Sequence, residues 1–139
     1  MDVHDHAEIA TRLRAAGIPV TLQRLAIAGL LFREPIHITA EQLLKQVKRN
    51  APETSRATIY NTLRLFAEKG LIKELVVQPE RVVFDSNTQP HHHLYNAETG
   101  ELTDLPADAM KVVGLPPLPE GTEIHQVDVI VRIRRERAH

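Results

Sequence analysis

Three consecutive histidines, His91, His92 and His93, are the residues of this chain best suited to chemistry. Neutral imidazole is a common protein ligand for zinc, iron, nickel and copper. If the run is extended, alternate side chains point to opposite faces, so His91 and His93 share one face and His92 takes the other. This geometry predicts two sites rather than one cluster. The competing interpretation is a solvated polar loop, whereas an expression tag is disfavoured because the run is internal.

Length and composition exclude several classes of protein. The chain has 139 residues, 42% of them hydrophobic, which is enough for one domain or two small ones. No apolar run reaches the roughly 18 residues of a membrane span, and the N-terminus is too charged for a signal peptide. Because cysteine is absent, disulfides and thiolate zinc sites are excluded, which fits a cytoplasmic protein. A net charge of −1 argues by itself against a strongly electrostatic nucleic-acid binder.

The charge pattern divides the chain into two modules. Residues 1–85 carry 12 Lys/Arg and 10 Asp/Glu, whereas residues 86–131 carry one Lys and seven acids. A near-neutral module is therefore followed by an acidic one, and the join is expected near Asp85–Pro90. We predict a domain over residues 1–85 and a second over residues 86–139.

The first module reads as helices followed by a hairpin. Thr39 and Gln42 form a capping-box pattern, and Gly17 and Gly70 are suited to helix ends. Pro79-Glu80 separates two strand-like segments, and helices followed by a hairpin indicate a winged helix-turn-helix. The helices are expected at about residues 7–16, 21–32, 40–47 and 55–70, and the strands at 72–78 and 81–85.

The last helix of this module has a polar face suited to the DNA major groove. Tyr60, Asn61 and Arg64 lie beside the small Ala57 on the face opposite the apolar stripe. Arginine and asparagine make bidentate contacts to purine edges, and aromatic or apolar atoms can meet the thymine methyl. Taken alone, such a face is more often an ordinary solvated surface.

The second module is predicted to be a small α/β unit, which makes the whole chain α+β. Strands are expected at residues 93–95, 101–105 and 122–135, with a short helix at residues 106–113. His125 falls on the apolar face of the long last strand, where a lone histidine is more often a hydrogen-bonded core residue than a ligand. A small sheet with unpaired edges often completes itself through a partner.

Several motifs together resemble the ferric uptake regulator superfamily. They are Thr21–Arg24, His37–Glu41, Ser55–Leu63, Val83–Asp85 and His91–His93, in the order and spacing of that family. Within it, three successive histidines and missing cysteine pairs resemble the iron response regulators. The resemblance implies a homodimer of winged-helix domains, joined by C-terminal domains, that regulates promoters with AT-rich inverted repeats. The structural zinc of the family is not expected, because its Cys-x-x-Cys-Gly motif aligns with Asn96–Gly100.

The resemblance also implies the metal ligands. A regulatory site for Fe(II), Mn(II) or Zn(II) would use five residues: His37, Asp85, His91, His93 and Asp104. A second site would use His92 and His125. One usual ligand position of that site is Pro90 here and another aligns near Lys111, so Asp108 or Glu123 would have to substitute. Haem, associated with iron response regulators, would be bound by the triplet His91, His92 and His93.

For DNA, the resemblance agrees with the polar helix face and adds phosphate contacts. Bases would be read by Tyr60, Asn61 and Arg64, and phosphates would be met by Arg24, Ser55, Arg56 and Thr58. Base contacts specify sequence, whereas phosphate contacts fix position.

Three functions from different classes are compatible with these residues. The first is an iron- or haem-responsive transcription regulator. The second is a peroxide-sensing repressor, in which Fe(II) at the same site drives oxidation of His37 or His91; the carboxylates of Asp85 and Asp104 keep this alternative open. The third, a metal-dependent hydrolase, is disfavoured because no H-E-x-x-H pair is present.

Overall fold

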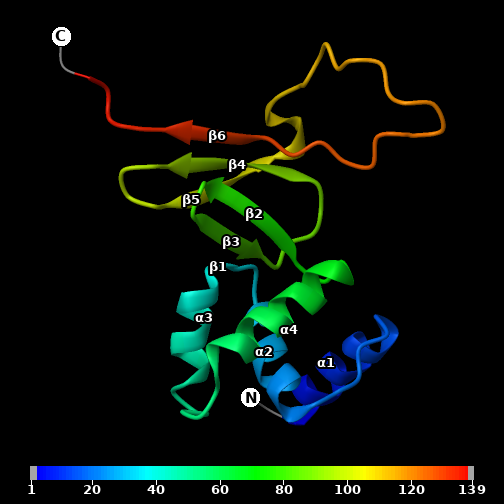
Figure 1. The fold of residues 1–139 in the computed structure, drawn as a ribbon, viewed down its shortest axis with the longest axis vertical. Coiled ribbons are helices and arrows are strands. Elements are labelled where there is room, and N and C mark those ends of the chain that lie inside the picture. Colours follow the sequence, from blue (N-terminus) through cyan, green and yellow to red (C-terminus); the bar gives the residue numbers. More distant parts are fainter. Residues whose placement is uncertain (1–2, 138–139) are drawn as a thin grey trace. The chain divides into compact units, whose positions relative to one another are not determined.

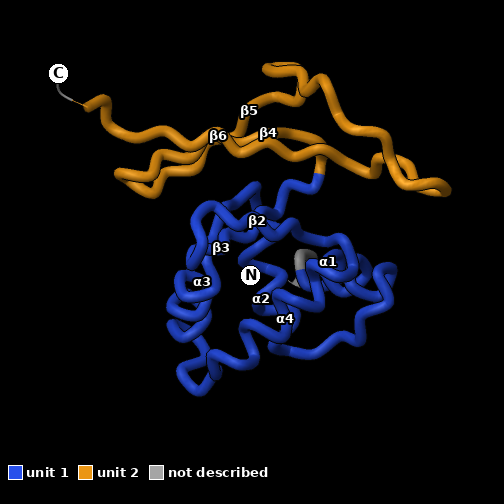
Figure 2. The backbone as a smooth tube through the Cα atoms, turned by 45° about the horizontal axis from the view of Figure 1, so that its top comes forward, with its two compact units in different colours: residues 1–88 blue, residues 89–139 orange. Residues whose placement is uncertain are grey.

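The computed structural model describes residues 3–137, and the chain divides into two compact units, residues 1–88 and 89–139 (Figure 2). The division lies within the stretch where the charge pattern changes. Within the described range, none of the helices combines the length and apolar character needed to cross a bilayer.

Unit 1 contains α1 (Val3–Ala15), α2 (Leu22–Phe32), β1 (His37–Ile38), α3 (Ala40–Val47), α4 (Arg56–Glu68), β2 (Lys73–Gln78) and β3 (Arg81–Asp85). Unit 2 contains β4 (His91–Asn96), β5 (Leu102–Pro106), a 3-10 turn (Ala107–Ala109) and β6 (Ile130–Ile133).

Side-chain caps begin α2 and α3, two of the helices that the sequence predicts. The Thr21 hydroxyl accepts the Arg24 N–H at the start of α2. At α3 the capping box is confirmed, because the Thr39 hydroxyl accepts the Gln42 N–H while the Gln42 side chain accepts the Thr39 N–H. These bonds satisfy amide groups that a helix N-terminus otherwise leaves unpaired.

One apolar core holds the helices of unit 1 to its sheet. Leu13, Ile27, Leu43 and Phe66 have no exposed surface and come from the four helices described in this unit. The sheet has the order β1-β3-β2, with both neighbours of β3 antiparallel to it (Figure 1). The β2–β3 hairpin directly follows α4, so the winged helix-turn-helix predicted from sequence is confirmed.

The sheet of unit 2 is built around β4. β5 pairs with β4 antiparallel and β6 pairs with it parallel, giving the order β5-β4-β6 (Figure 1). Tyr95 on β4 is only 2% exposed and is the largest buried side chain of this unit. All three histidines of the triplet are also buried.

Hydrogen bonds hold the β4–β5 turn in place, and the turn contains no cysteine that could bind zinc. The Asn96 side chain accepts the N–H groups of Glu98 and Thr99, at 2.9 and 3.3 Å, and the Asn96 carbonyl accepts the Gly100 N–H. Gly100 has a φ of 78°, a conformation that glycine adopts without strain. An asparagine-centred turn therefore stands where the resemblance aligns a cysteine pair.

Two elements expected from sequence are wrong. Instead of a helix over residues 106–113, only the 3-10 turn Ala107–Ala109 forms, because the exposed side chains around it provide no packing to stabilise a short helix. Instead of a strand over residues 122–135, only Ile130–Ile133 forms a strand, because β4 ends opposite Ile133 and, at the other end, the His92 side chain rather than a main-chain carbonyl accepts the Val129 N–H. Apolar alternation predicts which side chains share a face, but a strand also requires a hydrogen-bonded neighbour.

We expect Thr39→Ala to lower the free energy of unfolding by about 1 kcal/mol, because the Gln42 N–H loses its capping acceptor. Urea denaturation of the full chain would measure the change. Thr39→Ser keeps the hydroxyl and should stay close to wild type. Equal destabilisation by both substitutions would contradict the capping role.

Candidate metal centre and nucleic-acid face

Two histidines and an aspartate meet on one face of the unit 2 sheet. His91 and His93 alternate along β4, and Asp104 on β5 lies opposite His93 in the antiparallel register. The Nε2 atoms of both histidines lie 3.4 Å from Asp104 Oδ1. The histidines are buried, whereas the Asp104 side chain is 42% exposed. We call these three residues the unit 2 cluster.

A main-chain carbonyl orients the ring of His91. Its Nδ1 lies 2.6 Å from the Gln89 carbonyl oxygen, and because a carbonyl only accepts, Nδ1 carries the proton and donates. In the neutral ring the lone pair is then on Nε2, which faces the Asp104 carboxylate. Hydrogen bonds of this kind orient metal-ligating histidines. A lone pair facing a carboxylate is stabilised by a cation between them, either a proton or a metal ion.

The spacing of the unit 2 cluster fits a first-row divalent ion. Ligand atoms about 2.1 Å from an ion and at tetrahedral angles lie roughly 3.4 Å apart, the separation of both Nε2 atoms from Asp104 Oδ1. The potential ligand atoms of the three residues all lie within 4.8 Å of one another. Two imidazoles and one carboxylate suit Zn(II), Fe(II) or Mn(II) and leave coordination positions for further ligands.

Unit 1 contains a separate histidine–aspartate pair at the edge of its sheet. The β1–β3 register places His37 opposite Asp85, and His37 Nε2 lies 3.2 Å from Asp85 Oδ2. The Asp85 side chain is 1% exposed, and its Oδ1 accepts the Asn87 N–H at 2.8 Å. A buried carboxylate held by a main-chain amide and facing an imidazole is a second set of potential ligands, which we call the unit 1 pair.

The residues predicted for a second metal site are not brought together. His92 is buried, and its Nδ1 accepts the Val129 N–H at 3.1 Å. His125 and Asp108 are both exposed. Among the residues that the structure describes, the group with closely spaced ligand atoms includes none of these three.

Except for Arg24, the predicted DNA-contacting residues lie on the exposed face and at the N-terminal end of α4. Tyr60 is 43% exposed, and Asn61 and Arg64 are exposed as well. At the first turn the Ser55 hydroxyl caps the helix by accepting the Thr58 N–H at 3.1 Å. Arg24 lies on α2, where its Nη1 donates to the Pro19 carbonyl at 2.7 Å.

Arg56 has a partner that sequence reasoning missed. Its Nε and Nη2 donate to the two carboxylate oxygens of Glu41 at 2.7 and 2.9 Å, a bidentate pair joining the starts of α4 and α3. These hydrogen bonds lower the pKa of the Glu41 carboxyl and raise the pKa of Arg56. Fifteen residues separate the partners, so no local periodicity could reveal the pair.

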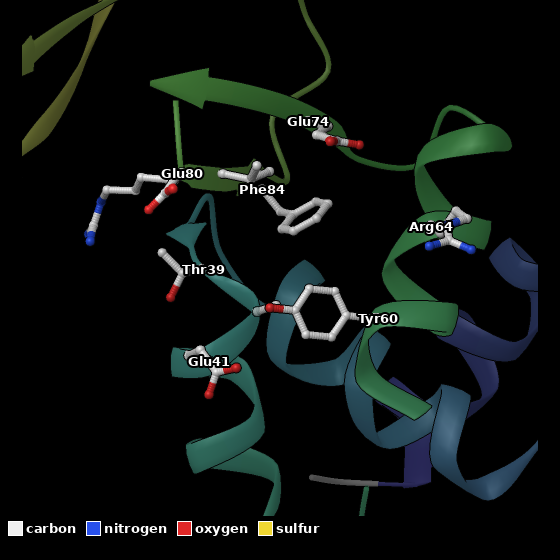
Figure 3. Close-up of a pocket in the computed structure, with 10 residues that line it drawn as sticks. Thr39, Glu41, Tyr60, Arg64, Glu74, Glu80 and Phe84 are labelled. Atoms are coloured by element: carbon white, nitrogen blue, oxygen red, sulfur yellow. The ribbon is translucent and has the colours of Figure 1, made fainter. Parts of the chain in front are cut away.

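A pocket of about 370 Å³ opens between α4, the start of α3 and the β2–β3 hairpin (Figure 3). Tyr60 points across it from α4 toward the start of α3, and Phe84 projects from β3. Arg64 lines the same pocket, together with the carboxylates of Glu74 and Glu80. The aromatic and guanidinium groups of α4 therefore share their surroundings with acidic groups of the hairpin, which the helix pattern alone does not reveal.

Comparisons with known proteins agree with this architecture. Residues 15–131 match the model of the Ferric uptake regulator family. The chain is 38% identical over 102 residues to the peroxide-responsive repressor PerR of Staphylococcus aureus strain Mu50, covering 73% of this chain and 69% of that protein.

Solved structures with similar folds include two regulators from other bacteria. The ferric uptake regulator from Pseudomonas aeruginosa with manganese has a TM-score of 0.70 at 22% identity, covering 93% of this chain and 98% of that one. The peroxide stress regulator of Campylobacter jejuni has a TM-score of 0.63 at 21% identity, covering 99% and 98%. At such identities the likeness shows the fold alone.

A winged-helix unit followed by a small β-sheet unit with a histidine–aspartate cluster defines a metal-responsive DNA-binding regulator. The chain belongs to the ferric uptake regulator family. It is a transcription regulator and not an enzyme, so the hydrolase alternative is wrong.

We expect Asp104→Asn to weaken Zn(II) binding by roughly tenfold or more, because the substitution removes the charge that faces both Nε2 atoms. Competition with a chromophoric chelator would measure the affinity. Asp108→Asn makes the same chemical change on the exposed 3-10 turn and should leave the affinity near wild type. The same loss in both variants would mean that general charge, rather than the unit 2 cluster, controls binding.

Proposed function

We propose that this chain is a peroxide-sensing, metal-dependent repressor of the ferric uptake regulator family. The observation that carries the proposal is the unit 2 cluster, in which two imidazole Nε2 atoms face one carboxylate oxygen at metal-ligand spacing. The 38% identity to a peroxide-responsive repressor supports the same subtype.

The regulatory ion would be bound by the unit 2 cluster and the unit 1 pair together. Three ligands from one unit leave a first-row ion with open positions, and His37 and Asp85 would supply two more. Only six positions along the chain separate Asp85 from His91, so the connection is short enough for both ends to reach one ion. The result would be a site of three imidazoles and two carboxylates.

A site with ligands from two units would couple ion binding to the angle between them. An ion shifts such an equilibrium only if its affinity differs between the two arrangements. Because the unit 1 pair lies on β1 and β3 and the cluster on β4 and β5, a bound ion would hold the winged helix in one orientation. Loss of one ligand would release it.

Peroxide sensing requires a redox-active ion and an oxidisable ligand. Bound Fe(II) would supply the redox chemistry that activates hydrogen peroxide next to the ligands. Overall, the ring of His37 or His91 would provide the two electrons: one peroxide oxygen would become a carbonyl at a ring carbon, the hydrogen of that carbon would move to a ring nitrogen, and the other oxygen would leave as water. The oxidised ring would coordinate the ion poorly, so DNA would be released.

We expect hydrogen peroxide to add one oxygen atom to His37 or His91 of the Fe(II)-loaded protein. Peptide mass spectrometry after a short exposure would locate the added atom. The Zn(II)-loaded protein is the control, because zinc has no redox chemistry and should leave the same peptides unmodified. The exposed His125 provides an internal comparison within each sample.

Two results would count against peroxide sensing. One is unmodified His37 and His91 in the iron form after DNA binding has been lost. The other is oxidation of His125 to the same extent as the ligand histidines, which would indicate diffusing oxidant rather than chemistry at the site.

DNA recognition is proposed for the exposed face of α4. Tyr60, Asn61 and Arg64 would read bases, and Ser55, Arg56, Thr58 and Arg24 would meet phosphates. Because Arg56 already donates two hydrogen bonds to Glu41, a phosphate would compete with that carboxylate for it. The net charge of −1 favours affinity supplied by a dimer on paired half-sites of an AT-rich inverted repeat, with steep salt dependence.

We expect Tyr60→Ala to reduce the preference for the inverted repeat over scrambled DNA by roughly tenfold or more, since base contacts contribute about 1–3 kcal/mol of discrimination. Fluorescence anisotropy on both DNA sequences would measure the ratio. Tyr60 is 43% exposed, so circular dichroism should remain that of the wild type. Thr103→Ala on the unit 2 sheet is the matched control. An unchanged ratio for Tyr60→Ala would remove Tyr60 from base recognition.

A homodimer formed through unit 2 is part of the proposal. Large apolar side chains are exposed throughout this unit, and Val113 reaches 76% exposure. Exposed apolar side chains in such number are typical of interaction surfaces. Others in the same unit are Val112, Leu115, Leu118, Ile124, Val127, Val131 and Ile133.

The narrower assignment to the iron response regulators, with haem as the signal, remains a prediction. The relatives described above are ferric uptake and peroxide regulators. The two functions differ in what happens to the triplet: haem would bind His91, His92 or His93 without oxidising it, whereas peroxide would oxidise a ligand. The peroxide experiment therefore separates them.

A further inference from the structure

The middle histidine of the triplet has a main-chain partner of its own. His92 is 8% exposed, and its Nδ1 accepts the Val129 N–H at 3.1 Å. The Val129 carbonyl in turn accepts the N–H of His93 at 3.0 Å. Both polar main-chain groups of Val129 are thus bonded to consecutive histidines of β4.

This pair of bonds lies where β6 first joins the sheet. β4 and β6 are parallel and their register begins with His93 opposite Ile130, so Val129 is the next residue outward. In a continuing parallel ladder a main-chain carbonyl would accept the Val129 N–H, and here an imidazole nitrogen accepts it instead. Apart from the 3-10 turn Ala107–Ala109, residues 107–129 form no helix or strand (Figure 1).

We propose that His92 is a positioning residue that anchors β6 to β4 and that it is not a metal ligand. A neutral imidazole whose Nδ1 accepts an amide proton carries its own proton on Nε2. Neither nitrogen then presents a lone pair to an ion. The other residues predicted for a second site do not fit either, since the cluster of closely spaced ligand atoms contains neither His125 nor Asp108, and Pro90, which precedes the triplet, has no ligating side chain.

The three histidines of the triplet would then serve two different functions. His91 and His93 present their rings to Asp104 on one face of β4, while His92 uses its ring to attach the neighbouring strand. The anchor would keep β4 and β6 together and so help to hold the two outer rings in place. This inference concerns unit 2 alone and does not require that the regulatory site senses peroxide.

Nitrogen-15 NMR of the histidine rings in the full-length protein tests the tautomer directly. For His92 we expect an unprotonated Nδ1 and a protonated Nε2, in the metal-free protein and after addition of Zn(II). The Nε2 resonances of His91 and His93 should shift on addition of Zn(II). A protonated Nδ1 on His92, or a shift of either His92 nitrogen matching those of its neighbours, would overturn the proposal.

Two substitutions separate anchoring from metal binding. His92→Leu removes the acceptor, and the hydrogen exchange rate of the Val129 amide should rise roughly tenfold or more. His92→Asn places an amide oxygen near the position of Nδ1, and exchange should remain close to wild type. Native mass spectrometry should find the same number of Zn(II) ions per chain in wild type and His92→Asn.

The outcomes are distinct even if His92→Leu folds poorly, because the tautomer is read in the wild-type protein. Slow Val129 exchange in His92→Asn with unchanged zinc stoichiometry supports the anchor. Loss of one zinc equivalent in His92→Asn, or equally fast exchange in both variants, refutes it. Failure of the peroxide experiment with these results intact would leave the anchor standing and remove only the proposed function.

Discussion

Alternation of side chains along β4 is the constraint on which the rest of unit 2 depends. A strand directs successive side chains to opposite faces, so three consecutive histidines are divided between two tasks. His91 and His93 meet Asp104, which the antiparallel register with β5 places opposite His93. His92 faces the other way and bonds to Val129. Slipping β4 by one residue would exchange these roles and separate the two outer rings from the carboxylate.

Hydrogen bonds to the main chain orient the side chains of the proposed metal ligands in both units. The Gln89 carbonyl orients His91, and the Asn87 amide holds Asp85. These bonds lie within each unit, so the unit 1 pair and the unit 2 cluster are each organised by their own backbone. Organisation before an ion arrives reduces the ordering cost of binding it.

Because the chain has no cysteine, unit 2 is stabilised without a disulfide or a cysteine-bound zinc ion. At Asn96 the turn between β4 and β5 is closed by side-chain and main-chain hydrogen bonds, and the Ala97 amide donates to the Ile133 carbonyl of β6. Tyr95 fills the interior beside this turn. Many large apolar side chains of the unit nevertheless stay exposed, which fits a unit whose folding and association are linked.

The sequence by itself determined the features that depend on neighbours along the chain. The caps at Thr21 and Thr39, the α4 face with Tyr60 and the split faces of the triplet follow from local hydrogen bonding and from helix and strand periodicity. Only the tertiary structure decided the features that need distant partners. They include the short extent of β6, the missing helix after Pro106, the Arg56–Glu41 pair and the bond from Val129 to His92. Each depends on which segments come together in space, and composition and periodicity do not encode that choice.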